Sequence, residues 1–223
     1  MRELYRQDLA QLGNELDRMS RNVARAIERA TTALREGDLM MAEQTIDADD
    51  RLDDAARDID QMCVALLALQ GPVASDLRLI LAALRLSQTM ERQGDLARHL
   101  ALIARSTYPN HSIAEPAAPL VNRMCDTAVQ MATLMMRLVS SQDLSLAAQI
   151  QDMDDTLDDL QVDIRRIVGD DAVDLTRSQV VDLTLAARFL ERFGDHTVSV
   201  SRRIVYIVEG ADTDSDLGVE GRL

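Results

Sequence analysis

Apolar residues recur at steps of three and four positions along most of the chain, the spacing that gathers side chains on one face of an α-helix. In the first helical segment this series begins at Leu9 and continues to Leu34, and Gly37-Asp38 ends it. No segment alternates apolar and polar residues with the two-residue period of a β-strand. The pattern therefore predicts an all-α protein built from six long helices.

Turn signals divide that pattern into two halves of three helices each. Proline cannot continue a helix and disfavours helical backbone in the residue before it, so Gln70-Gly71-Pro72 separates the second helix from the third. The segment from Ser106 to Pro119 contains three of the four prolines and is interpreted as a linker. Gly169-Asp170-Asp171 separates the fifth helix from the sixth, which we expect to begin near Leu175. The predicted organisation is a first three-helix bundle over residues 1–108, a linker over 109–119, a second three-helix bundle over 120–209 and a disordered tail over 210–223.

The two halves also resemble each other in sequence. Residues 47–59 read DADDRLDDAARDI and residues 152–164 read DMDDTLDDLQVDI, with eight of 13 positions identical at an offset of 105. Further along, residues 91–95 read ERQGD and residues 191–195 read ERFGD, at an offset of 100. Two motifs that recur in the same order predict that the three-helix bundle is duplicated.

The charge balance narrows the classes of function. The chain has 38 acidic and 24 basic side chains, a net charge of -14, and every basic residue is arginine. Such a chain is a poor candidate for binding nucleic acid, which requires the neutralisation of phosphates. No segment has the ~18–20 uninterrupted apolar residues of a membrane span, and the charged N-terminus does not resemble a secretory signal. We therefore expect a soluble, cytoplasmic protein in which Cys63 and Cys125 are buried thiols.

Aspartate is unusually frequent for a helical protein, because it is a poorer helix former than glutamate. Of 28 aspartates, 13 lie in the two copied segments, 47–60 and 152–163. At about 100° per residue, Asp49 and Asp53 fall on the flank of the apolar face of the first segment. The same positions of the second copy hold Asp154 and Asp158. The remaining aspartates of both segments are expected to face solvent.

In the third and sixth predicted helices, two carboxylates interrupt the apolar stripe itself. Glu91 and Asp95 lie four residues apart, and Glu191 and Asp195 repeat the arrangement. A buried carboxylate is costly unless it is paired or bound to a cation. Carboxylates on facing helices can bridge hard or borderline cations, so one explanation is a metal site in each half that holds iron, manganese or magnesium. The other is pairing with arginines of the same bundle, namely Arg85, Arg92, Arg98, Arg188 and Arg192.

Two further kinds of residue bear on the metal interpretation. His99 lies one turn after Asp95 and is a candidate further ligand, although a lone histidine is more often structural; Ser199 holds the matching place in the second half. Gly94 and Gly194 each precede a motif aspartate. Because glycine inside a helix costs about 1 kcal/mol relative to alanine, these positions predict the close approach of a neighbouring helix or of a bulky cluster.

These motifs resemble those of the PhoU family of phosphate-signalling proteins. The similarity covers about residues 5–209, and its most specific pieces are the ASDLRL run at 74–79 and the motifs at 91–95 and 191–195. It implies a fold of two three-helix bundles, which in some members bind multinuclear iron or zinc clusters. The family often has asparagine where this chain has His99 and Ser199, so the two sites need not have equal occupancy or metal preference. The ligands that the resemblance implies are Asp49, Asp53, Glu91 and Asp95 in one half and Asp154, Asp158, Glu191 and Asp195 in the other.

The resemblance also implies a function. It is that of a cytoplasmic, non-enzymatic adaptor between the ATPase of a phosphate ABC transporter and a sensor histidine kinase. The adaptor would restrain uptake and repress the phosphate-starvation response when phosphate is plentiful. Family members often form homodimers, and any contact with a membrane would come through the partners.

Two alternatives stay open. The first is a carboxylate-bridged metal enzyme, such as a di-iron oxidase or a hydrolase. Against it, the Glu-x-x-His motif of di-iron bundles is absent, because Gly94 and Gly194 stand where its histidines would be. The second is a purely structural bundle whose carboxylates form internal ion pairs.

Overall fold

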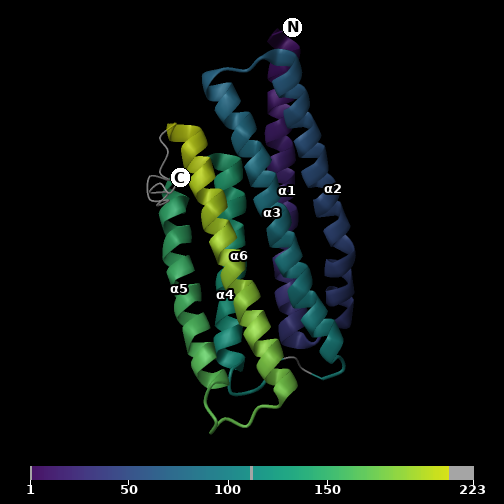
Figure 1. Ribbon diagram of the computed structural model, residues 1–223, viewed down its shortest axis with the longest axis vertical. Coiled ribbons are helices and arrows are strands. Elements are labelled where there is room, and N and C mark those ends of the chain that lie inside the picture. The colour runs from purple at the N-terminus through teal and green to yellow at the C-terminus, as the bar shows by residue number, and fades with distance from the viewer. Residues whose placement is uncertain (1, 111–112, 211–223) are drawn as a thin grey trace, which may run out of the picture.

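The computed structural model describes residues 2–110 and 113–210, and these residues form six α-helices and no β-strand. This confirms the predicted all-α fold. The first three helices form one bundle and the last three form a second bundle beside it, with all six axes running along the length of the molecule (Figure 1). The helices are α1 (Arg2–Glu36), α2 (Leu39–Gln70), α3 (Ala74–Thr107), α4 (Ala118–Ser141), α5 (Ser145–Val168) and α6 (Arg177–Glu209).

The turns of the first bundle follow from local chemistry. Gly37 takes a positive φ of 66° after α1, and the side chain of Asp38 then caps α2 by accepting a 3.0 Å hydrogen bond from the backbone N–H of Met41. Gly71 ends α2 in the left-handed conformation that glycine adopts without strain, and Pro72 follows it. The expected break between α2 and α3 is therefore present.

Two helix starts in the second half differ slightly from the expected ones. α4 begins at Ala118 rather than after the predicted linker, because proline is tolerated in the first turn and Pro119 lies there. α6 begins two residues later than expected, since Thr176 and Gln179 form a reciprocal capping box. The predicted tail lies outside the described residues, apart from Gly210, which caps α6.

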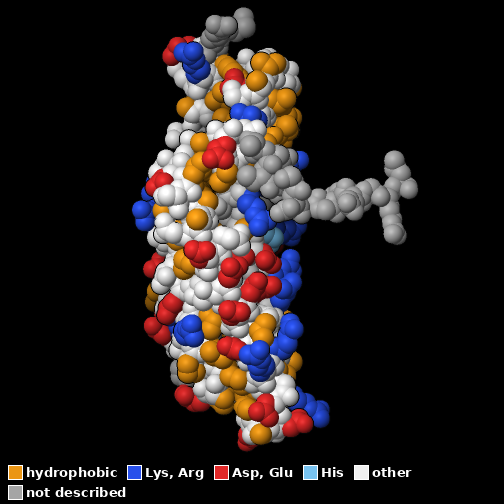
Figure 2. All heavy atoms as spheres, turned by 90° about the vertical axis from the view of Figure 1, so that its left-hand side faces the viewer, with side chains coloured by type: hydrophobic (Ala, Val, Ile, Leu, Met, Phe, Trp, Pro, Cys, Tyr) orange, Lys and Arg blue, Asp and Glu red, His pale blue; other side chains and the backbone are white. Residues whose placement is uncertain are grey.

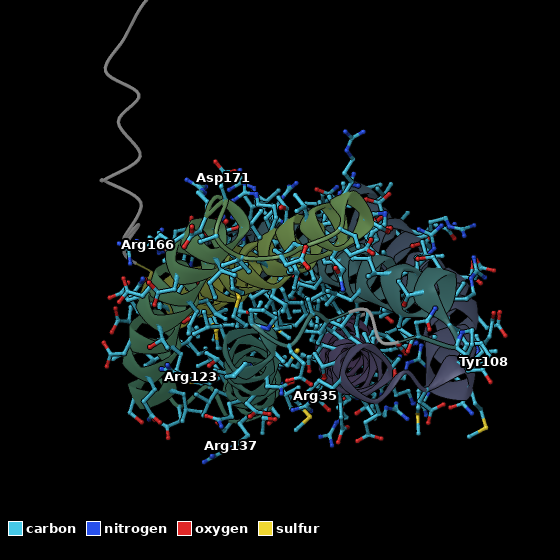
Figure 3. The ribbon with its side chains drawn as sticks, turned by 90° about the horizontal axis from the view of Figure 1, so that it is seen from below. Arg35, Tyr108, Arg123, Arg137, Arg166 and Asp171 are labelled. Atoms are coloured by element: carbon cyan, nitrogen blue, oxygen red, sulfur yellow. The ribbon has the colours of Figure 1, made fainter. Side chains whose placement is uncertain are left out.

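One large hydrophobic core extends through both bundles, and a small second cluster of buried alanines lies between α1, α2 and α3. α1 packs on α4 and α3 packs on α6. At the second contact, buried Gln93 donates a hydrogen bond of 2.8 Å to Thr197 Oγ1 across the interface. At the first, Arg35 of α1 forms an ion pair of 2.6 Å with Asp126 of α4, and Figure 3 labels Arg35 beside these neighbouring helices. The two bundles are therefore joined along their length.

Both cysteine side chains belong to the large hydrophobic core. Cys63 and Cys125 are free and buried, as predicted. Burial raises their thiol pKa values to about 11 and about 12, so both stay protonated at neutral pH. Among the described residues, no helix combines the length and apolarity needed to cross a bilayer.

Candidate functional site

The first group of candidate ligands comes together between α2 and α3. Asp49 and Asp53 lie on α2, and Glu91 and Asp95 lie on the facing stretch of α3. Burial, and then the nearby carboxylates of Asp95 and Asp53, raise the pKa of Asp49 to about 6. Burial likewise raises the pKa of Glu91. The structure therefore places these four acids close enough to repel one another.

The second group repeats the arrangement between α5 and α6. Burial, and then the charges of Asp195 and Asp158, raise the pKa of Asp154 to about 7. The pKa of Glu191 is also raised, first by burial and then by Asp195. Figure 2 shows acidic side chains gathered at mid-height on the side of the molecule formed by the second bundle. The duplicated sequence motifs thus correspond to two duplicated acidic clusters.

Within each cluster, the acidic side chains differ in exposure more than their positions around the helix predict. Asp49 and Asp154 are each only 9% exposed. The carboxylates of α3 and α6 were expected within the apolar stripe, but Asp95 is partly exposed and Asp195 is exposed. Asp158, expected at the core edge, is also exposed, because α5 packs only against α4 and α6 and its outer flank faces water. Each cluster therefore has one buried acid and a rim that solvent reaches.

Arginine pairing accounts for part of the acidic charge. Arg98 lies 3.4 Å from Asp49 Oδ2, and Arg188 lies 2.5 Å from Glu191. Arg92 lies 3.5 Å from Glu91 and 3.3 Å from Asp95. Three of the five arginines named from the sequence thus contact the clusters.

One side-chain oxygen of each buried aspartate has no hydrogen-bond partner among the described residues. The Oδ1 atoms of Asp49 and Asp154 are buried and accept no hydrogen bond from the described residues. A buried acceptor without a donor is costly, and it would be satisfied by a cation. Across the described part of the chain, however, no three or more His, Cys, Asp or Glu side chains are arranged to hold a metal ion. The residue types and the unsatisfied oxygens fit a cation, while a complete ligand shell would require side-chain rotation and release of an arginine.

The two motif glycines explain how the buried aspartates come so close to the neighbouring helix. A Cβ atom at Gly94 would lie 2.6 Å from Leu52 Cδ1. At Gly194, a Cβ atom would lie 2.7 Å from both Asp154 Oδ1 and Leu157 Cδ1. Both distances are shorter than real side chains allow, so the predicted close approach of a neighbouring helix is confirmed.

His99 and His196, the histidines among the described residues, lie at the junction of the two bundles. The ring of His99 stacks on Phe189 of α6, with ring centroids 5.0 Å apart and planes at 21°. This contact turns the ring toward the second bundle, whereas the carboxylates of the first half lie between α2 and α3. His196 is half-buried, and burial, followed by the charge of Arg192, lowers its pKa. The sequence alone does not predict the surroundings of either histidine, because these surroundings depend on how the two bundles pack.

Comparison with known proteins gives a consistent result. The PhoU domain family matches the chain twice, over residues 16–104 and 121–204. The chain is 37% identical over 211 residues to the phosphate-specific transport system accessory protein PhoU homolog 2 of Mycobacterium tuberculosis, covering 95% of this chain and 99% of that protein. It is 35% identical over 216 residues to PhoU homolog 1 of Mycobacterium leprae, covering 97% of each.

Two solved structures are similar in fold. The crystal structure of PhoU from Pseudomonas aeruginosa has a TM-score of 0.82 and 27% identity, and the match covers 93% of this chain and 100% of that one. The phosphate transport system regulatory protein PhoU from Streptococcus pneumoniae has a TM-score of 0.84. At 24% identity, covering 94% of this chain and 99% of that one, the second likeness concerns the fold alone.

Proposed function

This chain belongs to the PhoU family, and from that membership we propose that it regulates phosphate transport as an accessory protein of a phosphate-specific transport system. The observation that carries the proposal is the match along the whole length of curated relatives that bear this name, at 37% identity over 95% of the chain. The proposed mechanism is that of an adaptor. The chain would contact the ATPase of the phosphate ABC transporter and a sensor histidine kinase, act as a homodimer in the cytoplasm, and repress the starvation response when phosphate is plentiful.

We propose that this role is non-enzymatic. The residue types at the acidic clusters support that reading, because they supply carboxylates without the Glu-x-x-His pairs of di-iron enzymes. The ring of His99, the candidate nitrogen ligand, is stacked on Phe189. A reproducible turnover of phosphoesters or oxygen that is lost on Glu91→Ala would instead favour the alternative of a carboxylate-bridged metal enzyme.

We further propose that each acidic cluster binds a divalent cation. Asp49, Asp53, Glu91 and Asp95 would hold one, and the equivalent ligands of the second half are Asp154, Asp158, Glu191 and Asp195. Iron, zinc, manganese and magnesium are the candidates, because oxygen ligands suit hard or borderline cations. When bound, such a cation would offset the burial and the mutual repulsion that raise the carboxylate pKa values, and it would fasten α2 to α3 and α5 to α6. His99 would complete the first site only if its ring left Phe189.

Deletion of the gene tests the regulatory role. Under the proposed function, phosphate-starvation genes are derepressed at high phosphate in the deletion strain and are repressed again when the wild-type gene is restored. Because PhoU relatives occur as homologs 1 and 2 in Mycobacterium tuberculosis, any second copy is deleted as well. Unchanged expression in a strain without any copy would contradict the proposal.

A further inference from the structure

A groove of about 770 Å³ lies where the two bundles meet, between α2 and α3 of the first and α6 of the second. Its walls carry two carboxylates, Asp53 and Glu91, and four arginines, so four positive charges minus two negative ones leave an excess of two. The whole chain, by contrast, has a net charge of -14. Although Asp54 and Asp95 pair with two of these arginines, four arginines gathered in so acidic a chain mark a surface that would attract an anion. The arginines are Arg57, Arg85, Arg92 and Arg203.

Three of these arginines are only weakly engaged. The ion pair of Arg57 with Asp54 joins side chains that are 69% and 66% exposed. Arg92 pairs with residues of its own helix at 3.3 and 3.5 Å and is 66% exposed. An exposed pair such as that of Arg57 contributes little to stability, whereas the carboxylates that pair with Arg92 are 25% and 30% exposed. Arg85 is exposed, and its guanidinium forms no ion pair or hydrogen bond within the described part of the chain. An arriving anion would therefore displace little.

The internal repeat shows that the bundle does not need arginine at these positions. With the offsets of the two motifs, Arg57 corresponds to Val162, Arg85 to Leu185 and Arg203 to Ile103. Val162 and Leu185 are each 40% exposed, so an aliphatic side chain is tolerated at the same place in the second half. Only Arg92 keeps its charge in both copies, as Arg192. The arginines of the groove, apart from Arg92, are thus not required by the architecture that the two halves share.

We propose that this groove binds a small molecule that carries linked phosphoryl groups. The planar guanidinium donates two parallel hydrogen bonds to a phosphoryl or carboxylate oxygen pair, and several arginines together favour a ligand of multiple charge. The groove volume lies within the ~300–1,000 Å³ typical of small-molecule sites and greatly exceeds that of a single phosphate ion. Because Arg57 and Arg85 belong to the first bundle and Arg203 to the second, the bound ligand would bridge the bundles.

Isothermal titration calorimetry of the purified, chelator-treated chain tests this inference. Tripolyphosphate is the main probe, ATP distinguishes a nucleotide from a plain phosphate chain, and orthophosphate and sulfate report single anions. We expect one tripolyphosphate per chain, bound more tightly than sulfate at physiological salt. The double variant Arg57→Val with Arg85→Leu places the residues of the second half at these two positions. It should weaken binding about ten-fold or more, because it removes charge-assisted hydrogen bonds to the ligand.

The matched control removes two arginines elsewhere. Arg18 and Arg166 are 60% and 74% exposed and pair only within their own helices. Arg18→Val with Arg166→Leu makes the same change in net charge and should leave the dissociation constant within about two-fold. Equal affinity for sulfate and tripolyphosphate, equal losses in both double variants, or no measurable binding would each overturn the inference. Ligand binding is measured on the purified chain alone, without the transporter ATPase or the sensor kinase. The inference can therefore fail or succeed independently of the proposed function.

Discussion

Asp154→Asn is the substitution that isolates the electrostatic cost of the second acidic cluster. The pKa of Asp154 is raised from 3.8 to about 7 by burial and by Asp195 and Asp158. The folded chain therefore keeps a proton that the unfolded chain releases between about pH 4 and pH 7. Since the folded state binds more protons in this window, the free energy of unfolding falls as pH rises through it. Stability contributed by the protonated form is present below pH ~4 and lost above pH ~7.

The size of the effect follows from the shift. A shift of about three pKa units corresponds to a change of ~4 kcal/mol in the free energy of unfolding, at 1.36 kcal/mol per unit. This value is an upper bound. Because Asp158 and Asp195 are exposed and water screens their charges, we expect about half of that, ~2 kcal/mol. Asparagine keeps the shape of the side chain without the charge. In chelator, the variant should be more stable than wild type by ~2 kcal/mol at pH 8, about 4–8 °C in Tm, and equally stable at pH 4.

Thermal and urea unfolding between pH 4 and pH 8, followed by circular dichroism, provide the assay. Asp159→Asn is the control, because Asp159 is exposed on the same helix and its replacement should change the free energy of unfolding by less than ~0.5 kcal/mol. Added Mn²⁺ or Zn²⁺ should stabilise wild type at pH 8 more than Asp154→Asn, because the variant keeps only the first cluster intact. A variant that is less stable than wild type at pH 8 in chelator would refute the reasoning.

Two further predictions concern the same clusters. Gly194→Ala should destabilise the protein by ~1–3 kcal/mol, because its Cβ would lie 2.7 Å from Asp154 Oδ1 and Leu157 Cδ1. Gly13→Ala, where nothing lies within 4 Å, should instead stabilise by ~0.5–1 kcal/mol; chemical unfolding compares the two, and equal effects would count against close packing at Gly194. Elemental analysis of chain purified without chelator or affinity tag should find divalent metal in stoichiometric amount. Absence of metal, with Asp49 still paired to Arg98, would end the cation proposal.

The features that depend on local periodicity could be predicted from the sequence. The six helices, their order and the duplication follow from apolar spacing and repeated motifs. The close approach at Gly94 and Gly194 could also be predicted, because a glycine within an apolar helix carries a cost that only tight packing explains. Helical phase placed Asp49 and Asp154 correctly beside the core, since the spacing of a single helix determines which face a residue occupies.

The features that depend on how helices pack could not be predicted in the same way. The stacking of His99 on Phe189 joins residues 90 positions apart in different bundles. The exposure of Asp158 depends on which flank of α5 is left uncovered. The arginine-lined groove exists only because α6 of the second bundle lies against the first. Candidate ligands and candidate arginine partners could thus be named in advance, but which arginine pairs with which carboxylate could not.

The measurement that tests the regulatory account most directly is binding of the purified chain to its proposed partners. The transporter ATPase and the cytoplasmic part of the sensor kinase are each immobilised and titrated with the chain by biolayer interferometry, with and without phosphate. The account predicts saturable binding to both partners, with an affinity for at least one of them that changes with phosphate. Absence of binding to either partner in both conditions would contradict it.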